Sequence, residues 1–208
     1  MTSSWNVLFN NLPEIYMRVS RLLLQWTMLA LVTTLGARAT FAQNVPAMVI
    51  VVRHAEKATV GGADPSLSDV GQARAKALAT ALADAGVTAV ITTTYKRTFE
   101  TSDVVAMARN ITTEKVAIAG GTPAHVESIV SAVKKHPGEV VLVVGHSNTV
   151  PAIVTALGGP KMPDLCDANY ATMFIVHMAT NGKPAQVVRT RYGAAEADGA
   201  ETCTTPMK

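Results

Sequence analysis

Short apolar runs alternate along this chain with longer segments in which apolar and polar residues are mixed. Three of the runs, MVIVV, VTAVI and VVLVVG, are rich in valine and isoleucine. Such runs are typical of strands buried on both faces, in a sheet that helices cover on either side. The predicted strands are Met48–Arg53, Val87–Thr94 and Glu139–His146, with Val116–Ala119 as a shorter candidate.

The mixed segments between these strands repeat apolar residues at helical spacing. In the first of them, Ala75, Leu78 and Leu82 fall on one face of a helix. Ser68 or Asp69 can cap its start, because a short polar side chain accepts a hydrogen bond from a free backbone N–H. The predicted helices cover residues 68–86, 97–109, 122–137 and 148–159.

Two further apolar segments, at residues 171–179 and 185–192, follow the last helix. Asn181-Gly182 between them is a typical hairpin turn. Strands that alternate with helices form a parallel sheet with helices on both faces, and a hairpin reverses one strand. We therefore predict an α/β fold, a three-layer α/β/α sandwich with a mostly parallel sheet and a reversed edge strand.

The first forty residues break this pattern. A short basic segment, Met17–Arg21, precedes the apolar run Leu22–Gly36, and small residues follow up to Ala42. This is the layout of a secretory signal sequence. We predict a signal sequence over residues 1–42, with Met17 as an alternative start, and one domain over residues 43–208.

Export is the expected fate of this domain, to the periplasm or out of the cell. The alternative is an uncleaved membrane anchor, although the apolar run of about 15 residues is shorter than the roughly 20 of a spanning helix. We therefore expect contact with a membrane only through an uncleaved leader.

Length and charge limit the classes of partner. The chain has 208 residues and a mass of 21.8 kDa, which suits one compact domain. Removal of residues 1–42 takes away three arginines and one glutamate, so the net charge falls from +3 to +1. Nucleic-acid binding needs a basic face, so we predict no nucleic-acid partner. The sequence indicates no particular oligomeric state.

The chain contains two cysteines, Cys166 and Cys203. They have neither CxxC spacing nor the spacing of a metal site. In the oxidising compartment that export implies, they are expected to form one disulfide that fixes the C-terminal tail. Two unrelated free thiols are the alternative.

Basic and imidazole side chains appear where the predicted strands end. The first strand ends in Arg53-His54, the second leads through TTTYK to Arg97, and the strand VVLVVG is followed by His146. Because the carboxyl ends of parallel strands lie at one edge of a sheet, these four side chains can converge.

Such a cluster suits a phosphoryl group. Guanidinium groups donate paired hydrogen bonds to phosphate oxygens, and the start of a helix after His146 adds free N–H groups and a favourable dipole. An imidazole in this pocket can attack phosphorus and form a phosphohistidine that water later hydrolyses. If arginine and histidine neutralise the developing charge, no metal ion or other cofactor is needed.

The segments VVRHAEK, LSDVGQARAKAL, TTTYKRTFETSD and VVLVVGHSNTVPAIV resemble, in order, the four landmarks of the histidine phosphatase superfamily, also called phosphoglycerate mutase-like. The resemblance covers about Met48 to Met178. It implies that His54 is the phosphorylated nucleophile, that Arg53 and Arg97 hold the phosphoryl group, and that His146 stabilises the transition state. It also implies a three-layer α/β/α fold and no cofactor or metal.

The general acid is the part of the pattern that the chain does not match. Larger members of the family supply a carboxylate between the equivalents of Arg97 and His146, and here that segment is short. Glu127 is the nearest candidate, although a solvent-exposed helix face explains it better, and His125 and Glu56 are alternatives. The short form resembles small members such as bacterial phosphohistidine phosphatases, which work without this acid.

These patterns predict an exported, metal-independent phosphatase that acts on a small phosphorylated substrate through phospho-His54. Lys57 and Ser147 are the predicted additional substrate-binding residues. The alternative from another class is a non-catalytic phosphate-binding or envelope interaction module on the same fold.

Overall fold

The computed structural model describes residues 45–179 and 183–196. The predicted signal sequence, the Asn181-Gly182 turn and Cys203 lie outside these residues, so the leader, the turn and the disulfide stay predictions. Within the described ranges, no helix is both long and apolar enough to cross a membrane.

A mixed sheet of six strands forms the centre of the described domain. The strands are β1 (Met48–Arg53), β2 (Ala89–Thr93), β3 (Glu114–Val116), β4 (Val140–Gly145), β5 (Thr172–His177) and β6 (Gln186–Arg191). Their order across the sheet is β3-β2-β4-β1-β5-β6. The first four strands are parallel, and β5 runs antiparallel to both β1 and β6. This confirms the predicted α/β fold and places the carboxyl ends of β1, β2 and β4 at one edge.

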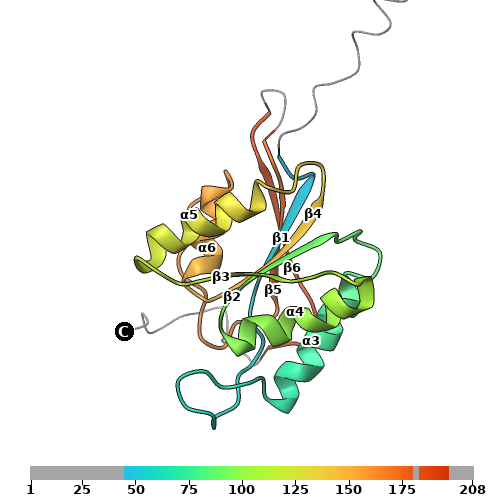
Figure 1. Ribbon diagram of the computed structural model, residues 1–208, viewed down its shortest axis with the longest axis vertical. Coiled ribbons are helices and arrows are strands. Elements are labelled where there is room, and N and C mark those ends of the chain that lie inside the picture. The colour runs from blue at the N-terminus through green and yellow to red at the C-terminus, as the bar shows by residue number, and fades with distance from the viewer. Residues whose placement is uncertain (1–44, 180–182, 197–208) are drawn as a thin grey trace, which may run out of the picture. The chain divides into compact units, whose positions relative to one another are not determined.

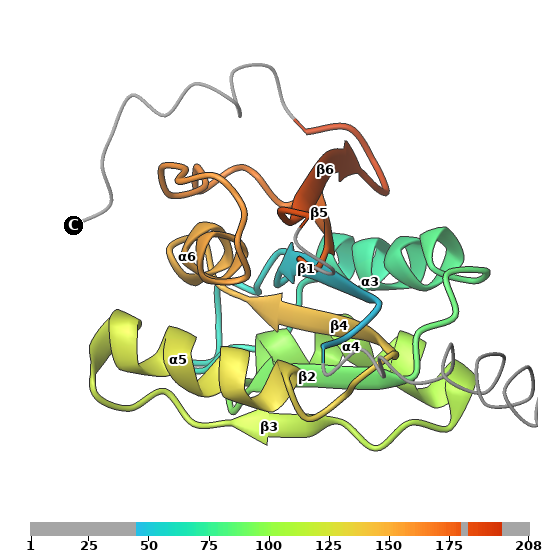
Figure 2. The same ribbon diagram turned by 90° about the horizontal axis from the view of Figure 1, so that it is seen from above.

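Helices cover both faces of the sheet. They are α3 (Asp69–Ala81), α4 (Lys96–Arg109), α5 (Gly121–Val133) and α6 (Thr149–Ala156). Figure 1 shows these helices beside the twisted strands, and Figure 2 shows α5 and α6 on one side of the sheet with α3 and α4 on the other. The three layers follow from the chain order, because each crossover between parallel strands carries one helix.

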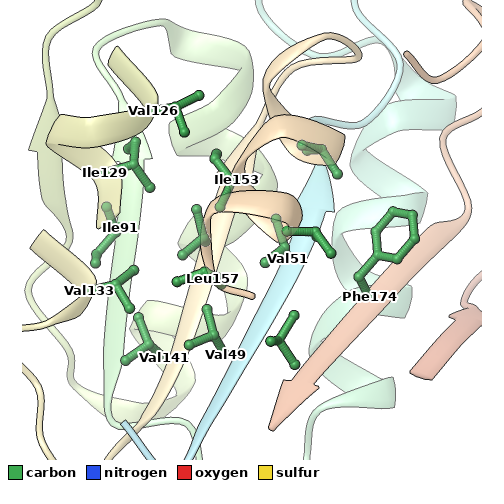
Figure 3. Packing of buried hydrophobic residues seen from close by; sticks show 14 of the residues in the cluster. Val49, Val51, Ile91, Val126, Ile129, Val133, Val141, Ile153, Leu157 and Phe174 are labelled. Atoms are coloured by element: carbon green, nitrogen blue, oxygen red, sulfur yellow. The ribbon is translucent and has the colours of Figure 1, made fainter. Parts of the chain in front are cut away.

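The core explains why the central strands have no polar alternation. Val49 and Val51 of β1 pack toward α5 and α6, while Ile50 and Val52 pack toward α3 and α4. All four are fully buried, as a strand covered on both faces must be. Figure 3 shows the first of these clusters, with Ile153 of α6 among the labelled residues that pack over the strands.

Two details differ from the sequence prediction. The third strand of the chain, β3, lies at Glu114–Val116 rather than at the predicted Val116–Ala119. Its pairing with β2 begins at Glu114 and ends at Val116. The chain then leaves the sheet, and Ile118 lines a cleft. The reversed strand is β5, and β6 occupies the edge, since a hairpin adds two strands and the second returns to the original direction.

The start of α3 is held against the loop that follows β1. The Ser68 side chain accepts a hydrogen bond from Gly71 N at 3.1 Å, and Ser68 N donates to Glu56 O at 2.9 Å. A Cβ at position 71 would stand 2.1 Å from Glu56 O, so only glycine allows this approach. The close packing fixes the path of the chain directly after His54.

Candidate active site

Four predicted residues lie on one cleft at the carboxyl edge of the sheet. The cleft has a volume of about 530 Å³, and its lining includes Arg53, His54, Arg97 and His146. Lys57 and Ser147, the two predicted substrate-binding residues, also line it. Parallel strands thus bring together side chains that are up to ninety-three positions apart in the sequence.

The backbone holds His54 by one of its two ring nitrogens and leaves the other available. It follows the last residue of β1, and its backbone N–H donates to Gly145 O at 2.9 Å. Its Nδ1 lies 2.8 Å from Ala55 O. Because a carbonyl only accepts, Nδ1 carries the hydrogen and Nε2 keeps its lone pair. Nε2 is therefore the nitrogen that can attack an electrophile.

The electrostatics of the cleft keep His54 neutral. Burial, with added repulsion from Arg53 and Arg97, lowers its pKa to about 3, although the hydrogen bond to Ala55 O acts in the opposite direction. Only 5% of the residue is exposed. A neutral imidazole at ordinary pH has the free electron pair that a nucleophile requires.

His146 stands beside His54, immediately after β4. The two rings meet edge to face with their centroids 5.3 Å apart. Nε2 of His146 lies 3.2 Å from the Thr93 hydroxyl, which in turn lies 2.8 Å from the Thr98 hydroxyl. Burial, followed by the charges of His54 and Arg97, lowers the pKa of His146 to about 3. This ring is thus fixed in orientation and neutral in the free protein.

Arg53 is positioned by the backbone of a loop between α6 and β5. Its Nη1 donates to Cys166 O at 2.7 Å and to Asp167 O at 2.9 Å. The guanidinium also lies over the Tyr170 ring, 4.2 Å from its centroid. Its buried Nε has no hydrogen-bond partner within the described part of the chain. One edge of the guanidinium is therefore anchored, while Nε remains available to an acceptor such as a phosphate oxygen.

Arg97 is positioned in a similar way on the other side of the cleft. It lies in the first turn of α4, 4.1 Å above the centroid of the Tyr95 ring. Its Nη1 lies 3.7 Å from the carboxylate of Asp64, which also accepts from Lys96 N at the start of α4. Stacking on a flat ring limits the movement of a guanidinium and leaves its edges free for hydrogen bonds.

The sequence reasoning missed several residues that hold these groups. Tyr95 had a signal, because it directly precedes the segment with Arg97. Tyr170, Asp167 and Thr93 had none, because each meets its partner only through long-range folding.

The three candidates for a general acid differ in whether they line the cleft. Glu127 is exposed on α5 and is not among the residues that line the cleft. Glu56 accepts hydrogen bonds from Arg74 at 2.8 to 2.9 Å and does not line the cleft either. Neither carboxylate is therefore placed to protonate a group bound in the cleft. His125 is buried and does line the cleft.

The lining of the cleft carries more positive than negative charge. Arg53, Arg97 and Lys57 contribute cations, and Asp167 is the one carboxylate among the described residues that line the cleft. Across the described ranges, no three His, Cys, Asp or Glu side chains are grouped so that they could hold a metal ion. The arrangement suits a small anion gripped by two guanidiniums beside a neutral imidazole.

Comparison with known proteins gives a family match for part of the chain. Residues 49–117 match the model of the histidine phosphatase superfamily (branch 1). No curated protein matches the sequence.

Solved structures share the fold at low sequence identity. The protein histidine phosphatase SixA complexed with tungstate is 17% identical, with 69% of this chain and 96% of that chain covered and a TM-score of 0.55. The putative phosphohistidine phosphatase SixA from Agrobacterium tumefaciens is 20% identical, with coverages of 76% and 100% and a TM-score of 0.50. Mycobacterial glucosyl-3-phosphoglycerate phosphatase is 14% identical, with coverages of 71% and 99% and a TM-score of 0.51.

Proposed function

This chain belongs to the histidine phosphatase superfamily, and on that premise we propose that it hydrolyses a small phosphomonoester or related phosphoryl compound through a covalent phosphohistidine on His54. Phosphatase activity in general is what the family and the similar folds support. The covalent route and its residues are our proposal.

The observation that carries the proposal is the state of His54. Its Nδ1 hydrogen is committed to Ala55 O at 2.8 Å, and its pKa of about 3 leaves Nε2 unprotonated at neutral pH. A phosphoryl group held by Arg53 and Arg97 can present phosphorus to this lone pair. A histidine kept only for packing does not need to share a cleft with two anchored guanidiniums.

The reaction then has two steps. In the first, Nε2 of His54 forms a bond to phosphorus while the bond to the leaving group breaks. In the second, water attacks phosphorus, the N–P bond breaks, and inorganic phosphate leaves. Negative charge grows on the phosphoryl oxygens during both steps, so the guanidiniums of Arg53 and Arg97 stabilise the transition states.

His146 and the start of α6 support the same charge. His146 can donate to a phosphoryl oxygen from its second ring nitrogen while Nε2 stays with Thr93. Ser147 lines the cleft just before α6, where the positive end of the helix dipole favours an anion. These groups offer the stabilisation that a metal ion provides in other phosphatases, and metal independence is part of the proposal.

The similar structures carry names of enzymes with different leaving groups. One is called a protein histidine phosphatase and another a glucosyl-3-phosphoglycerate phosphatase. An imidazole leaving group needs little help, whereas a sugar alkoxide must be protonated as it leaves. The class of substrate therefore depends on whether this chain offers a proton donor.

Turnover of an aryl phosphate tests the proposed function. Protein of residues 43–208 should release phosphate from p-nitrophenyl phosphate at an unchanged rate with and without a chelator. Binding of inorganic phosphate without turnover between pH 5 and 8 would favour the non-catalytic module instead. Turnover that the chelator abolishes would contradict the metal-free route.

We also propose that residues 1–42 direct export. N-terminal sequencing of the protein from a periplasmic or culture-medium fraction should give a start near Gln43. A protein that keeps its leader and stays in the membrane fraction would support the anchor instead.

A further inference from the structure

We propose that His125 donates the proton to the leaving oxygen, and that the substrates are therefore alkyl phosphomonoesters. This inference rests on the proposed function and names its missing acid. It concerns a buried histidine that the two steps described above do not use.

His125 is placed in the wall of the cleft by the first turns of α5. It is 1% exposed, and it lines the cleft together with His54 and His146. Its Nδ1 lies 3.2 Å from Ala117 O, so this nitrogen carries a hydrogen. Gly120 and Gly121 have φ angles of 70° and 79°, which let the chain turn between Ala117 and α5.

The other ring nitrogen of His125 lacks a partner in the part of the chain that the structure describes. Nε2 is buried and forms no hydrogen bond within the described residues. An unpaired buried polar atom is unfavourable because it has given up its hydrogen bonds to water, and such atoms in native proteins call for an explanation. A substrate oxygen in the cleft supplies the partner that the fold does not.

His125 also lies close enough to His146 for the charges of the two rings to interact. After burial and the charges of His54 and Arg97, the charge of His125 is the next cause that lowers the pKa of His146. His125 therefore lies close enough to the proposed site of the phosphoryl group to act on the leaving oxygen.

Other residues of the cleft are committed elsewhere. Asp167 has a 74% exposed carboxylate, 3.6 Å from Nη2 of Arg53. Tyr95 and Tyr170 lie beneath the two guanidiniums. His146 has its Nε2 at Thr93 and a pKa of about 3. Within the described residues, Arg53 and His125 are the cleft residues that have a buried nitrogen without a partner. A guanidinium does not release its proton, so His125 is the one of the two that can act as an acid.

The proposed step moves one proton from His125 to the leaving oxygen. Nε2 of His54 bonds to phosphorus, the P–O ester bond breaks, and its electron pair stays on the leaving oxygen. That oxygen takes the proton from Nε2 of protonated His125 and departs as an alcohol. In the second step, water attacks phosphorus, the new O–P bond forms and the N–P electron pair returns to His54. The proton of that water passes to solvent, and His125 takes up a proton from solvent before the next turnover.

The substrate class follows from the need for this proton. An alkoxide is a poor leaving group and gains most from an acid, whereas a nitrophenolate or an imidazole gains little. Ile118 follows Ala117 directly, lines the cleft and is 41% exposed. It offers an apolar contact for the carbon part of an alkyl ester.

The test compares two esters and two substitutions. His125→Asn keeps a donor for Ala117 O but has no group at the position of Nε2, and His125→Gln keeps an amide without an acidic proton. Both should lose roughly 10²-fold or more in kcat on glycerol phosphate, the range that general acids contribute, and should change little on p-nitrophenyl phosphate. Glu127→Gln, two residues along the same helix and exposed, is the matched control and should leave both rates unchanged.

A second measurement needs no substitution. Across a series of phosphate esters with increasingly basic leaving groups, the wild-type kcat should fall only slightly, because protonation offsets the poorer leaving group. A steep fall, or no turnover of any alkyl ester, would overturn the role of His125. Equal losses on both esters in the His125 variants would also overturn it, since they would indicate a structural role. A wild type that is inactive even on p-nitrophenyl phosphate would instead overturn the proposed function, and this inference with it.

Discussion

The imidazole rings of His54 and His146 meet edge to face, with their centroids 5.3 Å apart, although 92 positions separate them in the sequence. Parallel pairing of β1 with β4 brings them together, because the last residues of the two strands, Arg53 and Gly145, lie opposite each other and a histidine follows each of them. The register of two strands thus sets the distance between the proposed nucleophile and its neighbour.

His146 should contribute to the rate through the charge it stabilises. His146→Gln should lower kcat on p-nitrophenyl phosphate by roughly 10²-fold, as expected for loss of one transition-state donor. Thr93→Val removes the hydroxyl 3.2 Å from Nε2 and should cost about 1 kcal/mol, or about five-fold. Steady-state kinetics of the two variants would check this order. A Thr93→Val rate as low as that of His146→Gln would contradict it.

Arg53 should not tolerate replacement by lysine. The guanidinium donates to Cys166 O and Asp167 O while it stacks on Tyr170, and a lysine ammonium cannot do both. Arg53→Lys should therefore lower kcat/KM by roughly 10²-fold. Asp167→Asn is the contrast, since its exposed carboxylate lies 3.6 Å from the guanidinium and contributes little. Comparable losses in the two variants would mean that charge, rather than geometry, holds Arg53.

Acid should destabilise the domain through the same two histidines. Both pKa values lie near 3 in the fold, burial being the largest cause, against 6.5 in the unfolded chain. The unfolded state thus binds more protons between these values, so the free energy of unfolding falls as the pH drops from about 6.5 toward 3. The slope is up to about 1.4 kcal/mol per pH unit for each ring.

Urea unfolding at pH 7 and pH 5 measures this slope. A double variant, His54→Asn with His146→Asn, should lose less stability on acidification than the wild type does. Equal losses in the two proteins would show that other groups cause the acid sensitivity.

Gly71 should be required for stability because a side chain there would collide with the backbone at Glu56. A Cβ at this position would stand 2.1 Å from Glu56 O, so Gly71→Ala forces α3 away from the loop after β1. We expect a loss of about 1–3 kcal/mol in the free energy of unfolding, measured by urea denaturation. Gln72→Ala, at an exposed neighbouring position, should change it by less than about 0.5 kcal/mol.

The strand ends could be predicted from the sequence because a local signal marks them. Arg53, His54 and His146 directly follow apolar runs, and parallel topology alone places such positions at one edge of the sheet. The elements were predictable for a similar reason, since β1 and β4 are buried on both faces and contain no polar interruption.

The residues that orient the site could not be predicted in this way. Tyr170 meets Arg53 across more than a hundred positions through a loop that has no regular pattern. The choice between Glu127 and His125 depends on the rotation of α5, where each residue turns about 100° around the axis. Two positions therefore separate an exposed carboxylate from a buried imidazole in the cleft wall.

Rapid acid-free quenching during turnover of p-nitrophenyl phosphate, followed by peptide mapping, tests the central claim most directly. The account predicts alkali-stable, acid-labile phosphate on the peptide that contains His54, and none on the His54→Ala protein. Phosphate on any other residue, or protein-bound phosphate that is still found in the His54→Ala protein, would contradict the account.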